Sequence, residues 1–361
     1  MEGILLLKAS KVHVLSVLAL SLLLTGIPRA EADRHILFPT PEKVIYFLDI
    51  STSSDSANLW RLLRNSLLER LDSAMGAPNR KGLTPKKPTD LSISVINSNS
   101  SSSTPIEIIS IKDTERLWAF MINKVGGGNP TEARMRDIYK DFFGGSGVYR
   151  ELVEKYIQDE TILTPSNVEC ENSAEENLKQ GLFMDNVTPS IRTQATKEVC
   201  IIVSKLSNGI KKADAIFLAS PKCNKGGCSD VVGAVKVAAA VARDLSKVRN
   251  AKLCIAIASD MLNNSPQITK TGPWNTLYAI NKSATLLDAE KNGEIVASQS
   301  GILFSSKVKI RVNVIGQGGG SNFNPELSSK LDAYWSGFWK TVGLQNRQQS
   351  SLDQACNSGN N

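Results

Sequence analysis

Short apolar runs separated by helical patterns organise most of the chain. The runs lie at residues 43–48, 91–96, 106–111, 215–219, 253–258 and 308–315. Runs of this length, several of them rich in Ile and Val, are typical of strands buried in a sheet. Between them, apolar residues recur at helical spacing in residues 59–71, 231–248 and 327–342. Strands that alternate with helices predict an α/β fold: a Rossmann-like, doubly wound, mostly parallel sheet with helices on both faces.

Two segments depart from this alternation. Residues 112–200 are polar and helical in character, with glycine or proline breaks at 126–128, 144–145 and Pro165. They predict a largely helical insertion carried on an α/β domain that spans 33–344. Residues 345–361 are rich in Gln, Asn and Ser, a composition that predicts a disordered tail.

The first 32 residues predict a secretory signal peptide. Lys8 and Lys11 precede an apolar stretch at 12–27, and the small-x-small pattern Ala30-Glu31-Ala32 follows. The alternative is an uncleaved anchor, but the apolar stretch is short for a membrane span. We therefore expect cleavage after Ala32, no stable membrane span in the mature protein, and a secreted or periplasmic location.

Charge and cysteine content limit which class of partner the protein can bind and indicate the redox compartment in which it folds. The net charge is +7, but the basic residues are scattered with few aromatics among them, so we expect no nucleic-acid partner. An exported chain meets an oxidising compartment, which permits disulfides among the six cysteines. Six cysteines allow 15 pairings, and the sequence does not choose among them. Cys170 and Cys200 flank the polar helical segment and could staple it, and Cys223 and Cys228 are close enough to clip one loop. Cys254 lies within an apolar run and is expected to be a buried thiol.

Oxygen-bearing side chains follow two of the predicted strands and precede one helix. Asp49, Ser51 and Ser53 come after the run at 43–48, and Ser259 and Asp260 come after the run at 253–258. The sequence Gly226-Gly-Cys-Ser-Asp230 comes before the helix that begins near 231. Ligands of open parallel sheets bind beyond the carboxyl ends of the strands, so these loops are expected to meet. Such hard oxygen ligands suit Mg²⁺, Mn²⁺ or Ca²⁺.

These residues make the chain resemble a von Willebrand factor A domain, the fold shared with integrin I domains. The metal-ion-dependent adhesion site of that family combines an Asp-x-Ser-x-Ser motif, a Thr in a second loop and an Asp that ends a later strand. Asp49-Ile-Ser-Thr-Ser53 and Asp260 match the first and third elements. For the second, counting back from the helix gives Ser229, whereas counting forward from the glycines gives Cys228. A hydroxyl suits a hard cation and a thiol does not, which favours Ser229.

The resemblance implies an exported binding module and not an enzyme. Its Mg²⁺, or Mn²⁺ or Ca²⁺, would be held by Asp49, Ser51, Ser53, Ser229 and Asp260, and would accept an acidic side chain from a protein partner. Two alternatives stay open: a metal-dependent hydrolase that uses Asp49 and Asp260, and a scaffold whose metal site is vestigial. Against the hydrolase, Ser51 stands where an aspartyl-phosphate enzyme has a second Asp. In the plainest interpretation, Asp49 and Ser51 only cap the following helix or satisfy loop amides, and Asp260 only caps a turn.

Overall fold

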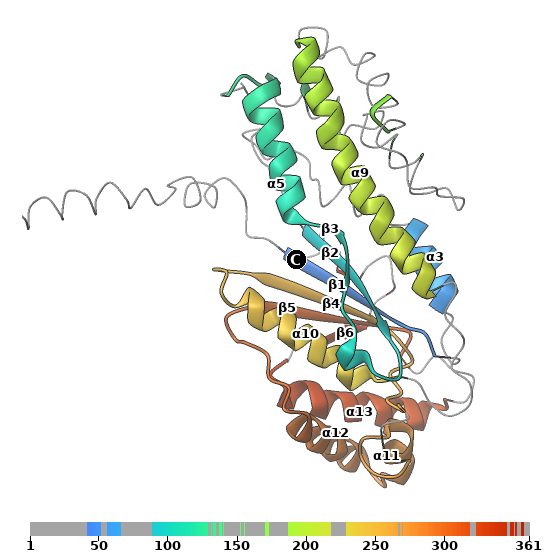
Figure 1. The fold of residues 1–361 in the computed structure, drawn as a ribbon. Coiled ribbons are helices and arrows are strands. Elements are labelled where there is room, and N and C mark those ends of the chain that lie inside the picture. The colour runs from blue at the N-terminus through green and yellow to red at the C-terminus, as the bar shows by residue number, and fades with distance from the viewer. Residues whose placement is uncertain are drawn as a thin grey trace, which may run out of the picture. The chain divides into compact units, whose positions relative to one another are not determined.

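A six-stranded sheet forms the centre of the structure, a computed structural model. Its strands are β1 (Glu42–Asp49), β2 (Thr89–Ile96), β3 (Ile106–Ile109), β4 (Lys252–Ala258), β5 (Lys309–Ile315) and β6 (Arg347–Gln349). They lie in the order β3-β2-β1-β4-β5-β6 (Figure 1). All neighbouring strands are parallel except β2 and β3, which are antiparallel. The strand order reverses between β1 and β4, which makes their carboxyl ends the topological switch point.

The structure describes eight continuous stretches of the chain. They are residues 42–51, 56–65, 89–128, 187–217, 229–265, 270–317, 323–344 and 347–349, with short pieces at 131, 133–134, 137–138, 140, 152, 155, 170–172, 268, 351 and 355–356. All of them belong to the compact unit Thr40–Asn361. The predicted signal peptide lies outside the described residues, as does most of the region between 129 and 186.

The described helices follow in chain order. They are α3 (Ser56–Asn65), α5 (Ile111–Phe120) with the π-helical turn η2 (Met121–Val125), α9 (Pro189–Phe217), α10 (Val231–Leu245), α11 (Thr276–Lys282), α12 (Leu286–Ser300) and α13 (Pro325–Thr341). A short 3₁₀ turn, η1 (Ser100–Ser102), follows β2. None of the described helices is both long and apolar enough to cross a membrane.

Alternate residues of the central strands face two different layers. Ile45 and Phe47 of β1 join a buried cluster with Ile255 and Ile257 of β4, formed with α10 and α13. The opposite face is covered by α3 and α9, where Trp60 stacks on Phe217 with ring centroids 5.4 Å apart. The α/β layering with helices on both faces is therefore as predicted.

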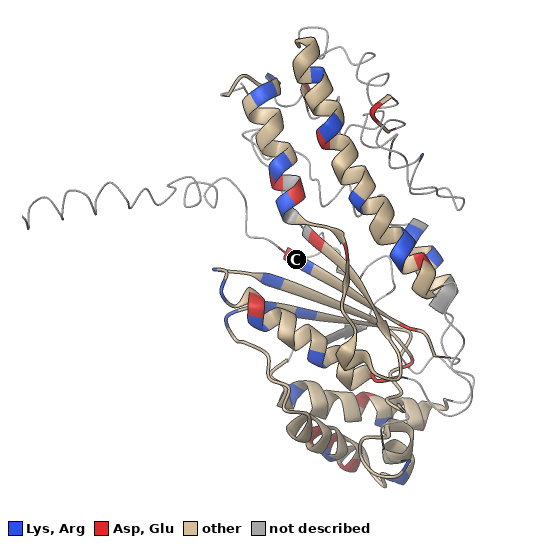
Figure 2. Ribbon diagram, in the orientation of Figure 1, with Lys and Arg blue, Asp and Glu red and all other residues tan. Residues whose placement is uncertain are grey.

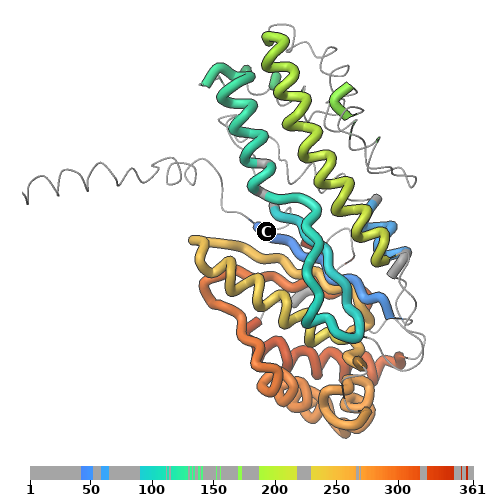
Figure 3. The backbone as a smooth tube through the Cα atoms, viewed as in Figure 1, coloured from blue at the N-terminus to red at the C-terminus, as the bar shows by residue number. Residues whose placement is uncertain are grey.

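Helices α5 and α9, with the turn η2, contain most of the described residues of the polar segment 112–200. Helices α5 and α9 lie side by side (Figure 3), and Lys205 and Arg116 join them through ion pairs with Asp113 and Glu198. Charges of both signs are mixed along these helices, and in β1 and β4 charged residues stand only at the strand ends (Figure 2). Most of the described residues of 112–200 are thus helical.

The predicted strand at 215–219 is wrong where the structure describes it. Residues 215–217 are the last turn of α9, which begins at Pro189 and continues past residue 200. A short apolar run is compatible with either a buried strand or a buried helix. Here it continues the helix that precedes it. The third predicted strand is shorter than expected, since it ends at Ile109 and Ser110 caps α5 by accepting from the Lys112 amide.

The prediction of a disordered tail is wrong for the residues described there. Residues Arg347–Gln349 add β6 to the edge of the sheet, and Ala355 and Cys356 are buried. Cys254 is not a thiol, because it forms a disulfide with Cys356, 102 residues away in sequence. Cys170 pairs with Cys200, one of the pairings that the sequence left open. Cys223 and Cys228 lie outside the described residues.

Candidate metal site at the carboxyl edge of the sheet

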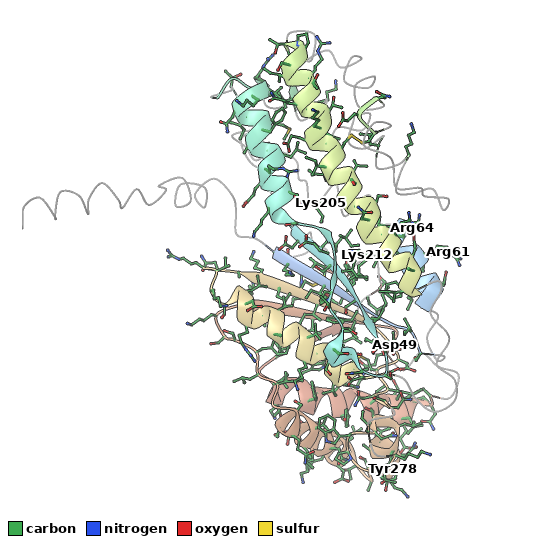
Figure 4. All side chains as sticks on the ribbon, viewed as in Figure 1. Asp49, Arg61, Arg64, Lys205, Lys212 and Tyr278 are labelled. Atoms are coloured by element: carbon green, nitrogen blue, oxygen red, sulfur yellow. A yellow bond between two sulfur atoms is a disulfide. The ribbon has the colours of Figure 1, made fainter. Side chains whose placement is uncertain are left out.

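Asp49 ends β1 and is fully buried at the switch point. Its Oδ1 accepts hydrogen bonds from the Ser51 amide at 2.9 Å and from the Ser229 hydroxyl at 3.0 Å. Its Oδ2 accepts from the Ser259 hydroxyl at 2.6 Å. Figure 4 shows Asp49 at the edge of the sheet where η1 and the start of α10 lie. Three loops that are distant in sequence therefore converge on one carboxylate.

The loop before α10 presents the Ser229 hydroxyl to Asp49. Asp230 is the N-cap of α10, and its carboxylate accepts from the Gly233 amide at 2.8 Å and from the Ser100 amide at 3.1 Å. The backbone of Ser229 is fixed by Asn264, which bonds both its amide and its carbonyl. Because the backbone groups of Ser229 are satisfied in this way, its side chain is held in position toward Asp49.

The loop after β4 supplies the second carboxylate. The Ser259 amide donates to the Ile315 carbonyl, which continues the pairing of β4 with β5. The Asp260 carboxylate accepts from the Leu262 amide at 2.9 Å and is almost fully buried. Met261, directly after Asp260, takes a left-handed backbone conformation with φ 65°, which is uncommon for a residue other than glycine.

The electrostatics of the site disfavour a bare negative charge on Asp49. Burial raises the pKa of this carboxyl above its usual 3.8, and the hydrogen bonds from Ser259 and Ser51 lower it less than burial raises it. The nearby Asp260 carboxylate raises the pKa of Asp49 further. A positive charge placed between the two carboxylates would counter both effects.

The structure brings together four of the five residues that the resemblance assigned to the metal. Asp49, Ser51 and Ser229 are joined by hydrogen bonds, and Asp260 lies near enough to act on the charge of Asp49. Ser53 lies outside the described residues. Ser259 contacts Asp49 but was not among the assigned residues, although its place directly after a strand and before Asp260 was a usable signal.

The donor set at this edge fits a hard divalent cation by its chemistry. Each of these side chains offers oxygen, and two of the oxygens are carboxylates. Among the residues that the structure describes, no three His, Cys, Asp or Glu side chains gather into a metal-binding group. A cation here would therefore depend on serine hydroxyls and water for much of its coordination.

Comparison of the chain with known proteins does not assign it to a family. No protein-family model matches the sequence, and no curated protein is similar enough to count as a relative. The assignment of this edge as a candidate site therefore rests on the geometry of Asp49, Ser229, Ser259 and Asp260.

Proposed function

We propose that the protein is an exported binding module, related to von Willebrand factor A domains, that recognises an acidic side chain of a protein partner through a divalent cation. The observation that carries this proposal is the buried Asp49 carboxylate at the switch point, approached by Ser51, Ser229 and Ser259 and close to Asp260. Ligands of open α/β sheets bind at this place in the fold.

The balance of charge favours a cation at this edge. Burial and the neighbouring Asp260 raise the free energy of the ionised Asp49 carboxylate, and a divalent cation beside it would lower that free energy. Asp49, Ser51, Ser229 and Asp260 would hold Mg²⁺, Mn²⁺ or Ca²⁺, directly or through water, with Ser53 as a further candidate. When bound, the ion would supply an electrophilic position that a carboxylate from another protein can occupy.

Binding fits this donor set better than catalysis does. Among the described residues, the groups that donate hydrogen bonds to Asp49 are neutral hydroxyls and a backbone amide, none of which is a general base at neutral pH. Neutral ligands leave more of the ion's charge for an incoming carboxylate. Export fits the two disulfides, since such bonds persist in oxidising compartments.

A second candidate, a scaffold with a vestigial metal site, is favoured by one observation. Both oxygens of Asp49 accept hydrogen bonds from within the protein. A carboxylate with such partners can serve a structural role by joining β1, β4 and α10, with no ion needed for that purpose. Addition of metal separates the two candidates. A binding module should become more stable and bind its partner, and a scaffold should do neither.

Titration calorimetry with Mg²⁺ and Mn²⁺ tests the proposal. The oxidised protein should bind one ion, and Asp49→Asn should abolish binding while keeping the shape of the side chain. Asp244→Asn is a matched control, because Asp244 is an exposed residue of α10 away from the site. If the unaltered protein binds neither ion, the binding module is wrong and the scaffold is left. Turnover of p-nitrophenyl phosphate by the metal-loaded protein would instead favour the hydrolase.

A further inference from the structure

A chain of hydrogen bonds links α13 to the carboxylate of the candidate site. The Trp335 indole Nε1 donates to the Met261 carbonyl at 2.9 Å. The Met261 amide donates to the Ser259 hydroxyl at 2.9 Å, and that hydroxyl donates to Asp49 Oδ2 at 2.6 Å. All four residues are buried, so water does not compete strongly with these contacts.

The middle of this chain is a residue in an uncommon conformation. Met261 has φ 65°, and a left-handed backbone is unfavourable for a residue with a side chain, because its Cβ comes too close to the following carbonyl oxygen. Such a conformation persists where the surroundings fix it. Here the two backbone polar groups of Met261 are both engaged, the amide by Ser259 and the carbonyl by Trp335.

Trp335 is itself held rigidly. Its ring contacts Tyr334, Phe338 and Trp339 of the same helix, with centroid separations of 5.4, 5.1 and 5.7 Å. The neighbouring Tyr334 hydroxyl donates to the Pro273 carbonyl at 2.9 Å, so the same turn of α13 also fixes the far arm of the loop that leaves β4. One turn of helix thus holds both arms of the loop that carries Asp260.

We infer that Trp335 is a positioning residue for the candidate site, which fixes Met261 in its left-handed conformation so that Ser259 is aimed at Asp49. The part of this inference that concerns metal affinity rests on the proposed function. The anchoring of Met261 by Trp335 does not. Outer partners of this kind orient the groups that contact a metal and tune its affinity.

The helix provides a matched control for Trp335. Trp339 lies one turn further along α13 and is also buried, but among the described residues its Nε1 has no hydrogen-bond acceptor. Trp335→Phe and Trp339→Phe therefore remove the same atoms from the same cluster, and only the first removes a hydrogen bond to the site loop. A difference between the two variants isolates that hydrogen bond from general packing.

The first measurement needs no metal. Amide hydrogen exchange, followed by NMR in the presence of EDTA, should show faster exchange at Met261 in Trp335→Phe than in Trp339→Phe. Equal exchange in the two variants would overturn the anchoring, whether or not the protein binds metal. Failure of the unaltered protein to bind metal would overturn the proposed function and leave this result standing.

The second measurement is Mn²⁺ affinity by calorimetry, under conditions where all variants are folded. Trp335→Phe should weaken binding about tenfold, the low end of the effect of outer-shell partners, and Trp339→Phe should leave it unchanged. In a Ser259→Ala background the effect of Trp335→Phe should vanish, because the chain is already broken. An equal loss in both backgrounds would show that Trp335 acts through packing and not through Ser259.

Discussion

The hydroxyl of Ser259 donates a 2.6 Å hydrogen bond to Oδ2 of Asp49 across 210 residues of sequence. This contact joins the carboxyl ends of β1 and β4, the two strands at which the sheet changes direction. The hydrogen bond lowers the pKa of Asp49, yet burial raises it by more. A directed hydrogen bond therefore holds the carboxylate in place while burial disfavours its negative charge. The stability of the protein should for this reason depend on both pH and metal.

Asp49→Asn should change stability in opposite ways with and without metal. The folded-state pKa of Asp49 lies above its usual 3.8, so the folded protein binds the proton more tightly than the unfolded chain does. The contribution of this group to the free energy of unfolding is thus largest below the pKa of the unfolded chain. It falls as pH rises from that pKa through the higher pKa of the folded protein. In EDTA at neutral pH, Asp49→Asn should be more stable than the unaltered protein, and this advantage should disappear at pH 3.

Saturating Mg²⁺ should reverse that order. A ligand at one hundred times its dissociation constant stabilises the folded state by about 2.7 kcal/mol, and only the protein with Asp49 should gain it. Urea unfolding in EDTA and in Mg²⁺, at pH 3 and pH 7, measures all of these quantities. A variant that gains as much from Mg²⁺ as the unaltered protein would show that Asp49 does not hold the ion.

Ser229→Cys should exchange one metal preference for another. A thiol is a poor ligand for Mg²⁺ and a good one for soft ions, so the variant should lose Mg²⁺ affinity by about tenfold or more and gain Cd²⁺ affinity. Calorimetry with the two ions makes the comparison. Ser259→Cys is the control, since Ser259 is inferred to act through Asp49 and should gain no Cd²⁺ affinity. Equal Cd²⁺ binding by both variants would remove Ser229 as a distinct ligand.

Glycine is required where α12 and α13 cross. A Cβ on Gly293 would overlap the Tyr334 carbonyl, and a Cβ on Gly337 would overlap the Glu290 carbonyl. Because both obstacles are backbone atoms, neither can move aside by a change of rotamer. Gly293→Ala and Gly337→Ala should each lower the free energy of unfolding by about 3 kcal/mol, the upper end for overpacked sites.

Urea denaturation checks the helix crossing, with Ser336→Ala as the control. Ser336 is exposed on α13 one residue before Gly337, and its replacement should change stability by less than about 0.5 kcal/mol. If the glycine variants were as stable as Ser336→Ala, the close approach of the two helices would be wrong.

The segment around Cys356 should stabilise the sheet on the face that carries Tyr46, opposite to Ile45 and Phe47. Besides the disulfide to Cys254, the Cys356 amide donates to the Asn313 side chain at 3.1 Å, and the Tyr46 hydroxyl donates to the Ala355 carbonyl at 3.0 Å. Replacing Cys254 and Cys356 together by Ala should cost about 4 kcal/mol, as expected for a closed loop of this length. Tyr46→Phe should cost about 1 kcal/mol, and chemical denaturation of both variants compares the two losses.

The sequence located the site better than it located the helices around it. The strand before Asp49 and the strand before Asp260 are short, apolar and bounded by polar residues, so their ends could be placed and the meeting of their loops inferred. Ser229, which the count back from the Ala- and Val-rich helix predicted as a metal ligand, forms a hydrogen bond with Asp49, and its role as a ligand stays a prediction.

Other features depend on contacts that no local pattern records. Helices α11 and α12 were not predicted, although Thr285 and Asp288 form a capping box at the start of α12. Gly293 in the middle of α12 argues locally against a helix, and it is tolerated only because α13 packs against it. Cys254 looked like a core thiol because its partner comes from a polar tail whose position depends on tertiary structure.

The distance in sequence between β1 and its neighbours has a consequence for synthesis. Strand β1 is the first described strand and is apolar through its centre. One of its edges pairs with residues 252–258, and its Tyr46 hydroxyl donates to the carbonyl of Ala355, close to the end of the sequence. During translation, that edge stays open until most of the chain has been synthesised. Folding should therefore be slow for a domain of this size, and premature release of a shortened chain would leave an apolar strand free to pair with other molecules.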